Sequence, residues 1–205
     1  MSSADLFRSR REEYAEATWQ AVVAAARELF GEAGYSRTTV QQIARRARVS
    51  PATVYAQCGG KQGLLKTLMA SWTAGPLVLE IIEACAAAPS AAEKLRVIAD
   101  GYVAIYQASG DIIRIVTDAA AAAPGAAEFL ETANARHHEA LLVIVAQIRE
   151  TGDLKKDISD EDAARIIHYH FRFEQFTLAA DTFGWGEDRT RDWIGERVRN
   201  ALLAV

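Results

Sequence analysis

Helix-breaking residues are scarce in this chain, and this scarcity most constrains what the chain can fold into. Proline occurs four times and glycine 13 times in 205 residues, while alanine-rich runs recur. Alanine favours helices, whereas β folds are rich in β-branched and aromatic residues. No segment alternates convincingly between apolar and polar residues, as a half-buried strand would. The sequence therefore predicts an all-α protein.

Helix boundaries follow from apolar spacing and from capping residues. Val22, Ala26, Leu29, Phe30 and Ala33 lie on one face of a helix. Four residues have side chains that cap helix N-termini: Thr39, Ser50, Ser90 and Ser159. The predicted helices span approximately 13–33, 40–47, 51–57, 61–74, 76–88, 90–108, 111–122, 126–151, 159–183 and 188–203.

Composition narrows the class of protein. Half of the residues are hydrophobic, which is enough for a sizeable core and argues against disorder. The two cysteines, Cys58 and Cys85, do not form a disulfide framework, so we expect a reducing, cytoplasmic location. We find no run of about 18 apolar residues and expect no membrane span. The charged N-terminus is not expected to be a secretory signal.

Charge is distributed unevenly along the chain. Residues 1–66 hold ten Lys or Arg and six Asp or Glu, whereas residues 67–205 hold 13 and 21. No acidic residue occurs between Glu32 and Glu80, an interval that contains six basic residues. This basic window indicates a polyanionic partner, although a solvated basic face would also explain it.

The same window contains a candidate helix-turn-helix. Two short helices are predicted on either side of a tight turn, and Ser50-Pro51 begins the second one. Ala44 is small where the two helices would cross, and Ile43 and Val54 are apolar where they would meet. The second helix carries small and polar groups able to approach base edges and phosphates.

The stretch from Val22 to Leu65 resembles the DNA-binding domain of TetR-family transcriptional regulators. About twenty positions agree in order and spacing without a gap: Val22, Val23, Ala25, Ala26, Leu29, Phe30, Gly34, Tyr35, Thr38, Thr39, Val40, Ile43, Ala44, Ala47, Val49, Ser50, Thr53, Val54, Tyr55, Lys61, Leu64 and Leu65. The resemblance implies an N-terminal three-helix helix-turn-helix domain joined to a larger C-terminal helical ligand-binding and dimerisation domain. We expect a flexible arm at 1–12, the DNA-binding domain at 13–66 and the second domain at 67–205.

Eight residues are expected to contact DNA: Thr39, Arg48, Pro51, Ala52, Thr53, Tyr55, Gln57 and Lys61. Thr39 would cap the first helix of the motif and offer its hydroxyl to a phosphate. Three others would hold phosphates and set the register: Thr53, Tyr55 and Lys61. Pro51, Ala52 and Gln57 would face the major groove, with Gln57 reading a base through its amide. A buried structural ring is the alternative for Tyr55.

Two positions depart from the family pattern. Arg48 stands where the turn usually carries glycine, so a side chain there costs of order 1 kcal/mol if the residue has a positive φ. A contact between the Arg48 side chain and a DNA phosphate would offset this conformational cost. Cys58 stands where an aromatic residue is usual, and it would pack as a smaller hydrophobic group.

The last helices are expected to form a dimer interface. Apolar residues at helical spacing favour a four-helix bundle across a two-fold axis, and the resemblance implies the same arrangement. A palindromic site has two half-sites, so it needs two DNA-binding domains. The expected interface residues are Ile167, Phe171, Ile194, Val198, Ala201 and Leu202. An intramolecular core is the alternative.

The middle helices are expected to hold a small-molecule pocket, which the resemblance implies. Its candidate residues mix aromatic and polar groups: Tyr102, Tyr106, Arg114, Phe129 and His137. Tyr102 and Tyr106 are four residues apart and share a helix face, whereas Arg114 interrupts an apolar run. Ordinary core packing is the alternative for each of them.

Metal and enzyme chemistry are not expected. His137-His138 are adjacent, and His168 and His170 are two apart, so members of each pair point away from one another on a helix. The sequence contains no nucleophile elbow, phosphate-binding glycine loop or metalloprotease motif, so no cofactor is expected.

We interpret the chain as a ligand-responsive transcriptional regulator of the repressor type that binds palindromic operator DNA as a homodimer. A small-molecule effector would release it by favouring a conformation that no longer fits the half-site spacing. The alternative is a helical ligand-binding or sequestering protein that does not recognise DNA.

Overall fold

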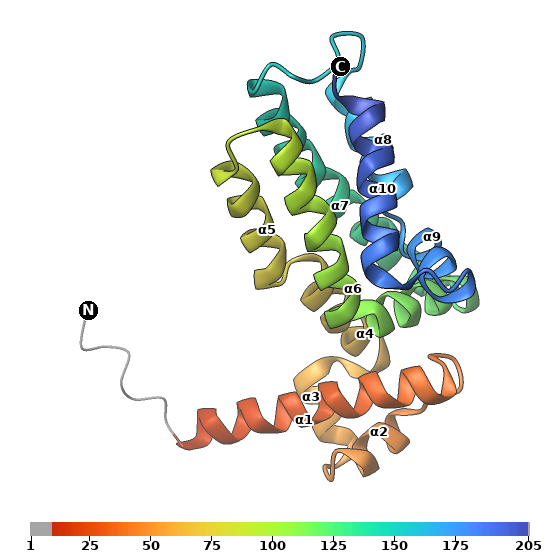
Figure 1. The fold of residues 1–205 in the computed structure, drawn as a ribbon. Helices are drawn as coiled ribbons and strands as arrows, with labels where there is room; N and C mark the ends of the chain where they lie inside the picture. The colour runs from red at the N-terminus through yellow and green to blue at the C-terminus, as the bar shows by residue number, and fades with distance from the viewer. Residues whose placement is uncertain (1–9, 205) are drawn as a thin grey trace, which may run out of the picture. The chain divides into compact units, whose positions relative to one another are not determined.

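The computed structural model describes residues 10–204, and these residues form an all-α fold (Figure 1). The N-terminal helices are α1 (Arg10–Ala33), α2 (Val40–Arg46), α3 (Pro51–Cys58) and α4 (Gly60–Thr73). They are followed by α5 (Pro76–Ala87), α6 (Ala91–Ala122) and α7 (Pro124–Glu150). The last elements are α8 (Asp160–His170), α9 (Phe173–Thr177), the π-helix η1 (Leu178–Thr182) and α10 (Gly186–Leu202). The part of the arm predicted at residues 1–9 lies outside the described residues, and residues 10–12 belong to α1.

All four predicted helix caps are confirmed. The hydroxyls of Thr39, Ser50 and Ser159 accept hydrogen bonds from backbone N–H groups in the first turns of α2, α3 and α8. Ser90 accepts from the Glu93 N–H at 3.2 Å and donates to the Glu93 carboxylate at 2.9 Å. Each cap satisfies a backbone donor that has no partner inside its helix, so short local patterns determine where these helices begin.

The predicted break near residues 109–110 is wrong, because α6 continues through it as one helix of 32 residues. Glycine weakens a helix without ending it. At Gly110 the missing side chain leaves room for a neighbour, since a Cβ there would lie 3.1 Å from the Phe173 ring. The opposite correction applies to 159–183, which is predicted as one helix but is divided into α8, α9 and η1.

Contacts divide the chain into two compact units. The first unit consists of the residues up to Ser71 together with Asp111–Leu130, and the second consists of Trp72–Gly110 together with the residues from Glu131 onward. The division therefore falls at 71/72, five residues after the domain boundary expected from the sequence, and it assigns a piece of α6 and α7 to the first unit.

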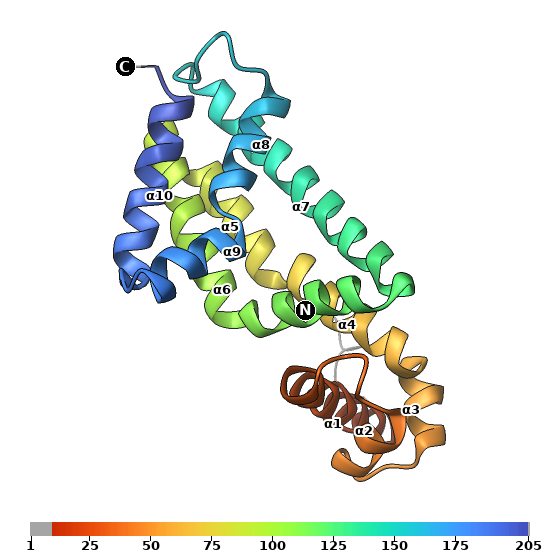
Figure 2. The same cartoon turned by 90° about the vertical axis from the view of Figure 1, so that its right-hand side faces the viewer.

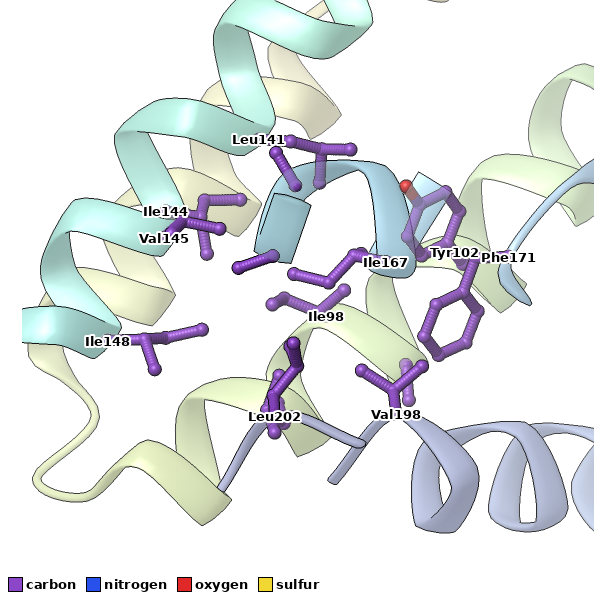
Figure 3. Packing of buried hydrophobic residues seen from close by; sticks show 14 of the residues in the cluster. Ile98, Tyr102, Leu141, Ile144, Val145, Ile148, Ile167, Phe171, Val198 and Leu202 are labelled. Atoms are coloured by element: carbon purple, nitrogen blue, oxygen red, sulfur yellow. The ribbon is translucent and has the colours of Figure 1, made fainter. Parts of the chain in front are cut away.

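The core of the second unit is an apolar cluster contributed by α5, α6, α7, α8, α9 and α10. Figure 3 shows part of it, with Val198 and Leu202 of α10 in the same cluster as Ile98 of α6 and Ile167 of α8. α8 and α10 are in contact and run side by side (Figures 1 and 2). This packing buries the apolar stripes of both helices.

One stretch, Gly60–Ala87, is long and apolar enough to cross a membrane by length and composition, with a mean hydropathy of 1.3. The stretch is not an unbroken apolar run, since Lys66, Glu80 and Glu83 lie within it. The stretch contains two helices, because α4 ends at Thr73 and α5 begins at Pro76.

Candidate functional site

The predicted helix-turn-helix is present in the first unit, where α2 packs on α3. The turn between them is closed by backbone hydrogen bonds, from Val49 N–H to the Ala44 carbonyl at 2.9 Å and from Arg48 N–H to the Arg45 carbonyl at 3.2 Å. Arg48 has a φ of 57°, and it is the one non-glycine residue with positive φ among the described residues. The expected backbone strain at this position is therefore confirmed.

α3 has one buried and one exposed side. Val54 and Cys58 face the interior, as their burial shows. Four of the five DNA-contact candidates on this helix are exposed: Pro51, Ala52, Tyr55 and Gln57. The fifth, Thr53, is half-buried. The Tyr55 side chain is 59% exposed, so the alternative of a buried structural ring does not hold.

Two glycines shape the turn between α3 and α4. Gly59 and Gly60 have φ values of 67° and 74°, which glycine adopts without the steric cost of a Cβ. A Cβ on Gly60 would also lie 2.8 Å from the Tyr55 ring, so this glycine lets the ring lie against the backbone at the start of α4. The turn therefore holds the Tyr55 side chain beside a helix N-terminus, where anions bind favourably.

Lys61 lies in the first turn of α4. Its Nζ is 4.4 Å from the centre of the Tyr35 ring and donates to the Ser36 carbonyl at 3.5 Å. Partial burial lowers the pKa of Lys61 from its ordinary value. The Tyr35 ring and the Ser36 carbonyl therefore orient the Lys61 ammonium group.

The arginines of α2 and the turn differ in their surroundings. Arg46 forms ion pairs with two carboxylates of α1, Glu28 at 2.7 Å and Glu32 at 3.2 Å. The hydrogen bonds to Glu32 and Glu28 raise the pKa of Arg46. Arg45 and Arg48 are exposed. Arg46 therefore ties α2 to α1, and its charge is paired although the residue is exposed.

A second cluster of interest lies inside the second unit. It joins aromatic and histidine rings from α6, α7, α8 and α9: Tyr102, Tyr106, His137, His168, Phe171, Phe173 and Phe176. We refer to these seven residues as the aromatic cluster. The rings of Tyr102 and Phe171 are parallel within 3°, with centres 4.5 Å apart, and Figure 3 shows them next to each other.

Neutral polar groups lie within the aromatic cluster. The Tyr102 hydroxyl and His137 Nε2 are 2.5 Å apart and form a hydrogen bond. The His168 ring meets the His137 ring edge-on at 4.6 Å. Burial is the main cause that lowers the pKa of His137, to about 3, and that also lowers the pKa of His168. Burial likewise raises the pKa of Tyr102. Tyr102 and His137 are therefore uncharged at neutral pH.

The backbone beside the aromatic cluster is irregular. α8 ends at His170, and the Phe171 carbonyl accepts a hydrogen bond from the Tyr106 hydroxyl. A second N-terminus follows at α9, and the chain then continues into the π-helix η1. Such interruptions of the helical ladder are frequent at functional sites.

Only part of the predicted ligand-site set is brought together. Tyr102, Tyr106 and His137 belong to the aromatic cluster, whereas Arg114 and Phe129 belong to the first unit. The sequence-based set did not include four residues of the cluster: His168, Phe171, Phe173 and Phe176. Their apolar spacing was the available signal, but it does not distinguish a cluster of this kind from ordinary core.

The predicted dimer-interface residues lie mostly inside the chain's own core. Five of the six are buried: Ile167, Phe171, Ile194, Val198 and Leu202. Ala201, the sixth, is half-buried. These five side chains pack against other parts of the chain itself, and their assignment to a dimer interface stays a prediction.

The start of α10 and the turn that precedes it carry a different set of apolar and basic groups. Trp193 is 45% exposed and Phe183 is 58% exposed. The Trp185 ring lies 5.6 Å from Trp193 and 5.9 Å from Phe183. Two guanidinium groups lie over the indoles, Arg189 over Trp185 at 4.6 Å and Arg197 over Trp193 at 5.8 Å. We call these five residues the tryptophan patch.

No group of three or more potential metal-ligating side chains occurs within residues 10–204. Both cysteines, Cys58 and Cys85, are buried and free, and burial raises the pKa of both thiols.

Comparison with known proteins places these two sites in context. Residues 22–68 match the family model described as bacterial regulatory proteins, tetR family. No curated protein matches the chain.

Solved structures of regulators resemble nearly the whole chain. The complex of SmeT with triclosan has a TM-score of 0.77 at 18% identity, covering 92% of both chains, and SmeT is described as the repressor of a multidrug efflux pump of Stenotrophomonas maltophilia. FadR from Bacillus subtilis, in complex with stearoyl-CoA, has a TM-score of 0.74 at 17% identity, covering 88% of this chain and 97% of FadR. NalD, a repressor of a multidrug efflux pump in Pseudomonas aeruginosa, has a TM-score of 0.70 at 22% identity, covering 92% of this chain and 98% of NalD. At these identities the likeness establishes a shared fold.

Proposed function

We propose that the chain is a transcriptional regulator of the TetR family, as the match of residues 22–68 supports, and that it binds palindromic operator DNA as a homodimer and is released by a small-molecule effector. Its place would be the cytoplasm, where its DNA lies. The observation that carries the proposal is the exposed face of α3, held beside the α4 N-terminus by a helix-turn-helix within the matched residues.

The chemistry of α3 supports DNA binding. Gln57 is exposed and offers an amide that can read an adenine edge. Tyr55, Lys61 and the exposed Arg48 would contact phosphates and set the register. Thr39 caps α2, with its hydroxyl engaged by Gln42, and would approach a phosphate from the helix start. Pro51, Ala52 and Thr53 would complete the surface in the major groove.

The tryptophan patch supports dimer formation through the outer side of α10. Tryptophan and arginine are enriched at the centres of protein interfaces, and exposed tryptophans are otherwise uncommon. We assign the interface to this patch in place of the five buried candidates. Two-fold symmetry then gives the dimer two DNA-binding domains.

The aromatic cluster supports effector binding. It combines apolar rings with a few convergent hydrogen-bonding groups, which is the usual composition of a small-molecule site. Two similar structures hold bound triclosan and bound stearoyl-CoA, and those ligands are properties of SmeT and FadR. An effector that binds better to a conformation unable to fit both half-sites would weaken operator binding.

The experiment selects DNA from a random pool with the purified protein and then measures the affinity for the selected sequence over a range of salt concentrations. We expect a palindromic site and a binding constant that falls steeply with salt. Lys61→Ala should weaken binding to all sequences alike and reduce the salt slope by about one unit. Lys156→Ala, which removes an exposed lysine of the second unit, serves as the control and should leave both quantities unchanged.

Two outcomes would contradict the proposal. If no sequence is enriched and binding does not depend on salt, the chain is a ligand-binding or sequestering protein without DNA recognition. If Lys61→Ala loses sequence preference but retains the full salt slope, Lys61 reads a base or supports the fold, and its phosphate role is wrong.

A further inference from the structure

We propose that the effector is an uncharged, planar aromatic molecule with a hydroxyl group, which binds by replacing the Tyr102 side chain against Phe171 and His137; this rests on the function proposed above. The Tyr102 side chain is itself a phenol, and in this structure it makes the two interactions that such a ligand would use. Its ring lies flat on Phe171 with 4.5 Å between centres, and its hydroxyl is 2.5 Å from His137 Nε2.

The shape of the site requires a flat ligand. The Tyr102 and Phe171 rings are parallel within 3°, so little space remains between them, and a ligand must separate them before it can bind. A planar ligand ring then regains the lost stacking with Phe171. Two further rings border the same position, with centres 5.7 Å (His137) and 5.9 Å (Tyr106) from the centre of the Tyr102 ring. A bulky aliphatic molecule would lose this stacking without replacing it.

The chain beside Phe171 is suited to such a movement. Phe171 lies at the break between α8 and α9, where the ladder of helical hydrogen bonds is interrupted. Its carbonyl is held by the Tyr106 hydroxyl from α6. The Tyr102 side chain can leave Phe171 by a change of rotamer, and the Phe171 ring, at a helix break, can adjust with little loss of helical hydrogen bonding.

The electrostatics of the site favour an uncharged ligand. The groups within reach of the Tyr102 hydroxyl are neutral, since burial keeps His137 and Tyr102 uncharged at neutral pH. Besides His138, the charged groups that act on these histidines are Arg172 and, for His168, Glu174; both are exposed and pair with each other at 3.2 Å. A carboxylate or ammonium ligand would therefore lose its hydration without gaining a buried counter-charge.

His137 supplies the specificity for a hydroxyl group. A neutral imidazole has one acceptor nitrogen and one donor N–H, and the nitrogen facing Tyr102 accepts from a hydroxyl when the other nitrogen carries the proton. A ligand hydroxyl can replace the Tyr102 hydroxyl at this nitrogen, so His137 retains a partner when Tyr102 moves away. A ligand without a hydroxyl would leave the nitrogen unpaired, which costs more than the bond itself contributes.

The test compares four probes that share one ring system and differ in charge and hydrogen bonding: 2-naphthol, naphthalene, 2-naphthoate and 2-naphthylmethylammonium. Binding to the full-length protein is measured at neutral pH by equilibrium dialysis. We expect 2-naphthol to bind roughly fivefold more tightly than naphthalene, which corresponds to one net hydrogen bond. The two ions should bind at least roughly tenfold more weakly than 2-naphthol.

Two variants test whether His137 is the residue that accepts a hydrogen bond from 2-naphthol. His137→Phe retains a ring and removes the acceptor, so 2-naphthol should lose its advantage while the affinity for naphthalene is nearly unchanged. His138→Phe is the control, because this adjacent histidine of α7 pairs with Glu161 at 3.1 Å and should leave the advantage intact.

Each remaining outcome is decisive. The proposal is overturned if none of the probes binds, if either ion binds as tightly as 2-naphthol, or if the advantage of 2-naphthol survives in His137→Phe. A parallel titration of the selected operator separates this inference from the proposed function. If 2-naphthol binds in a His137-dependent way but the protein does not bind or release DNA, the ligand class stands and the regulatory function fails.

Discussion

Arg48 occupies a backbone conformation that an arginine adopts only at a cost. Its φ of 57° lies in the left-handed region, where a Cβ crowds the following carbonyl. We expect Arg48→Gly to raise the free energy of unfolding by about 0.5–1 kcal/mol, because relief of the strain exceeds the larger entropy that glycine has in the unfolded chain. Urea denaturation measures this change.

The same variant tests why an arginine is present. If the Arg48 side chain reaches a phosphate, Arg48→Gly should bind the operator more weakly even though the fold is more stable, and the salt slope should fall by about one unit. Arg48→Ala separates the two effects, since it removes the guanidinium and keeps the strain. A glycine variant that is less stable than the wild type would contradict the assignment of strain.

His137 makes stability depend on pH. Burial lowers its pKa to about 3 in the folded protein, with His168, His138 and Arg172 acting in the same direction, whereas its ordinary value is 6.5. Between these values the unfolded chain binds a proton that the folded chain does not, so stability falls as pH falls through this interval. We expect a loss of about 2 kcal/mol in the free energy of unfolding between about pH 7 and about pH 5 from this residue alone.

His137→Phe should remove that part of the pH dependence, and urea denaturation at the two pH values measures the difference. The variant is expected to be less stable at neutral pH, because the Tyr102 hydroxyl loses its partner. Only the change with pH tests the pKa. An unchanged pH dependence in the variant would mean that the pKa of His137 in the folded protein is close to its ordinary value.

At the scale of single elements, the start of α4 depends on a glycine. A Cβ on Gly63 would lie 1.7 Å from the Cys58 carbonyl oxygen, so the end of α3 passes directly over this position. Gly63→Ala should displace α3 from α4, cost several kcal/mol of the free energy of unfolding, and weaken operator binding. Thermal denaturation and operator titration measure the two effects.

Gly31 provides a matched control within the same unit. It lies in α1, and a Cβ there meets nothing within 4 Å. Gly31→Ala should therefore raise the free energy of unfolding by about 0.5–1 kcal/mol through helix propensity alone. Equal effects of the two substitutions would show that the approach of Cys58 to Gly63 does not matter.

α10 presents two faces that respond differently to charge. Val198 is 1% exposed and packs in the core of the second unit, whereas Trp193 is 45% exposed. We expect Trp193→Glu to give a folded monomer, and Val198→Glu to lose cooperative unfolding because an unpaired carboxylate is buried. Sedimentation gives the mass of each variant, and circular dichroism gives its fold. A dimeric Trp193→Glu would remove the tryptophan patch from the interface.

At the scale of the whole molecule, a salt bridge ties α1 to the part of α6 that belongs to the first unit. Arg27 donates from Nε and Nη2 to the two carboxylate oxygens of Asp111, each at 2.6 Å. Hydrogen bonding between them raises the pKa of Arg27 and lowers that of Asp111. The two residues are 84 positions apart, so this bond is part of what makes residues 111–130 a component of the first unit.

The side chains of this pair are 40% and 43% exposed, so water and salt weaken the bond. A double-mutant cycle with Arg27→Gln and Asp111→Asn should give a coupling energy of about 0.5–1 kcal/mol at low salt. The coupling should decrease at about 1 M salt. The same cycle across Arg165 and Glu161 of α8 is the control and should give less, because its arginine is more exposed. Coupling of zero would show that this bond does not hold the segment.

Local interactions are the part of this protein that its sequence determines. The caps of α2, α3 and α8, the positive φ of Arg48 and the exposed side of α3 all follow from residues within a few positions of one another. Their hydrogen bonds and steric clashes are the same in any protein, so they could be predicted. The helix-turn-helix is short enough to be built almost entirely from such interactions.

Tertiary packing decides the rest. α10 carries apolar side chains on more than one face, and contact with α8 determines that Val198 is buried while Trp193 is exposed. Tyr102 meets Phe171 across 69 residues, whereas Arg114, twelve residues from Tyr102 on the same helix, belongs to the first unit. Burial depends on which distant helix covers a side chain, and helical periodicity specifies a face without specifying its partner.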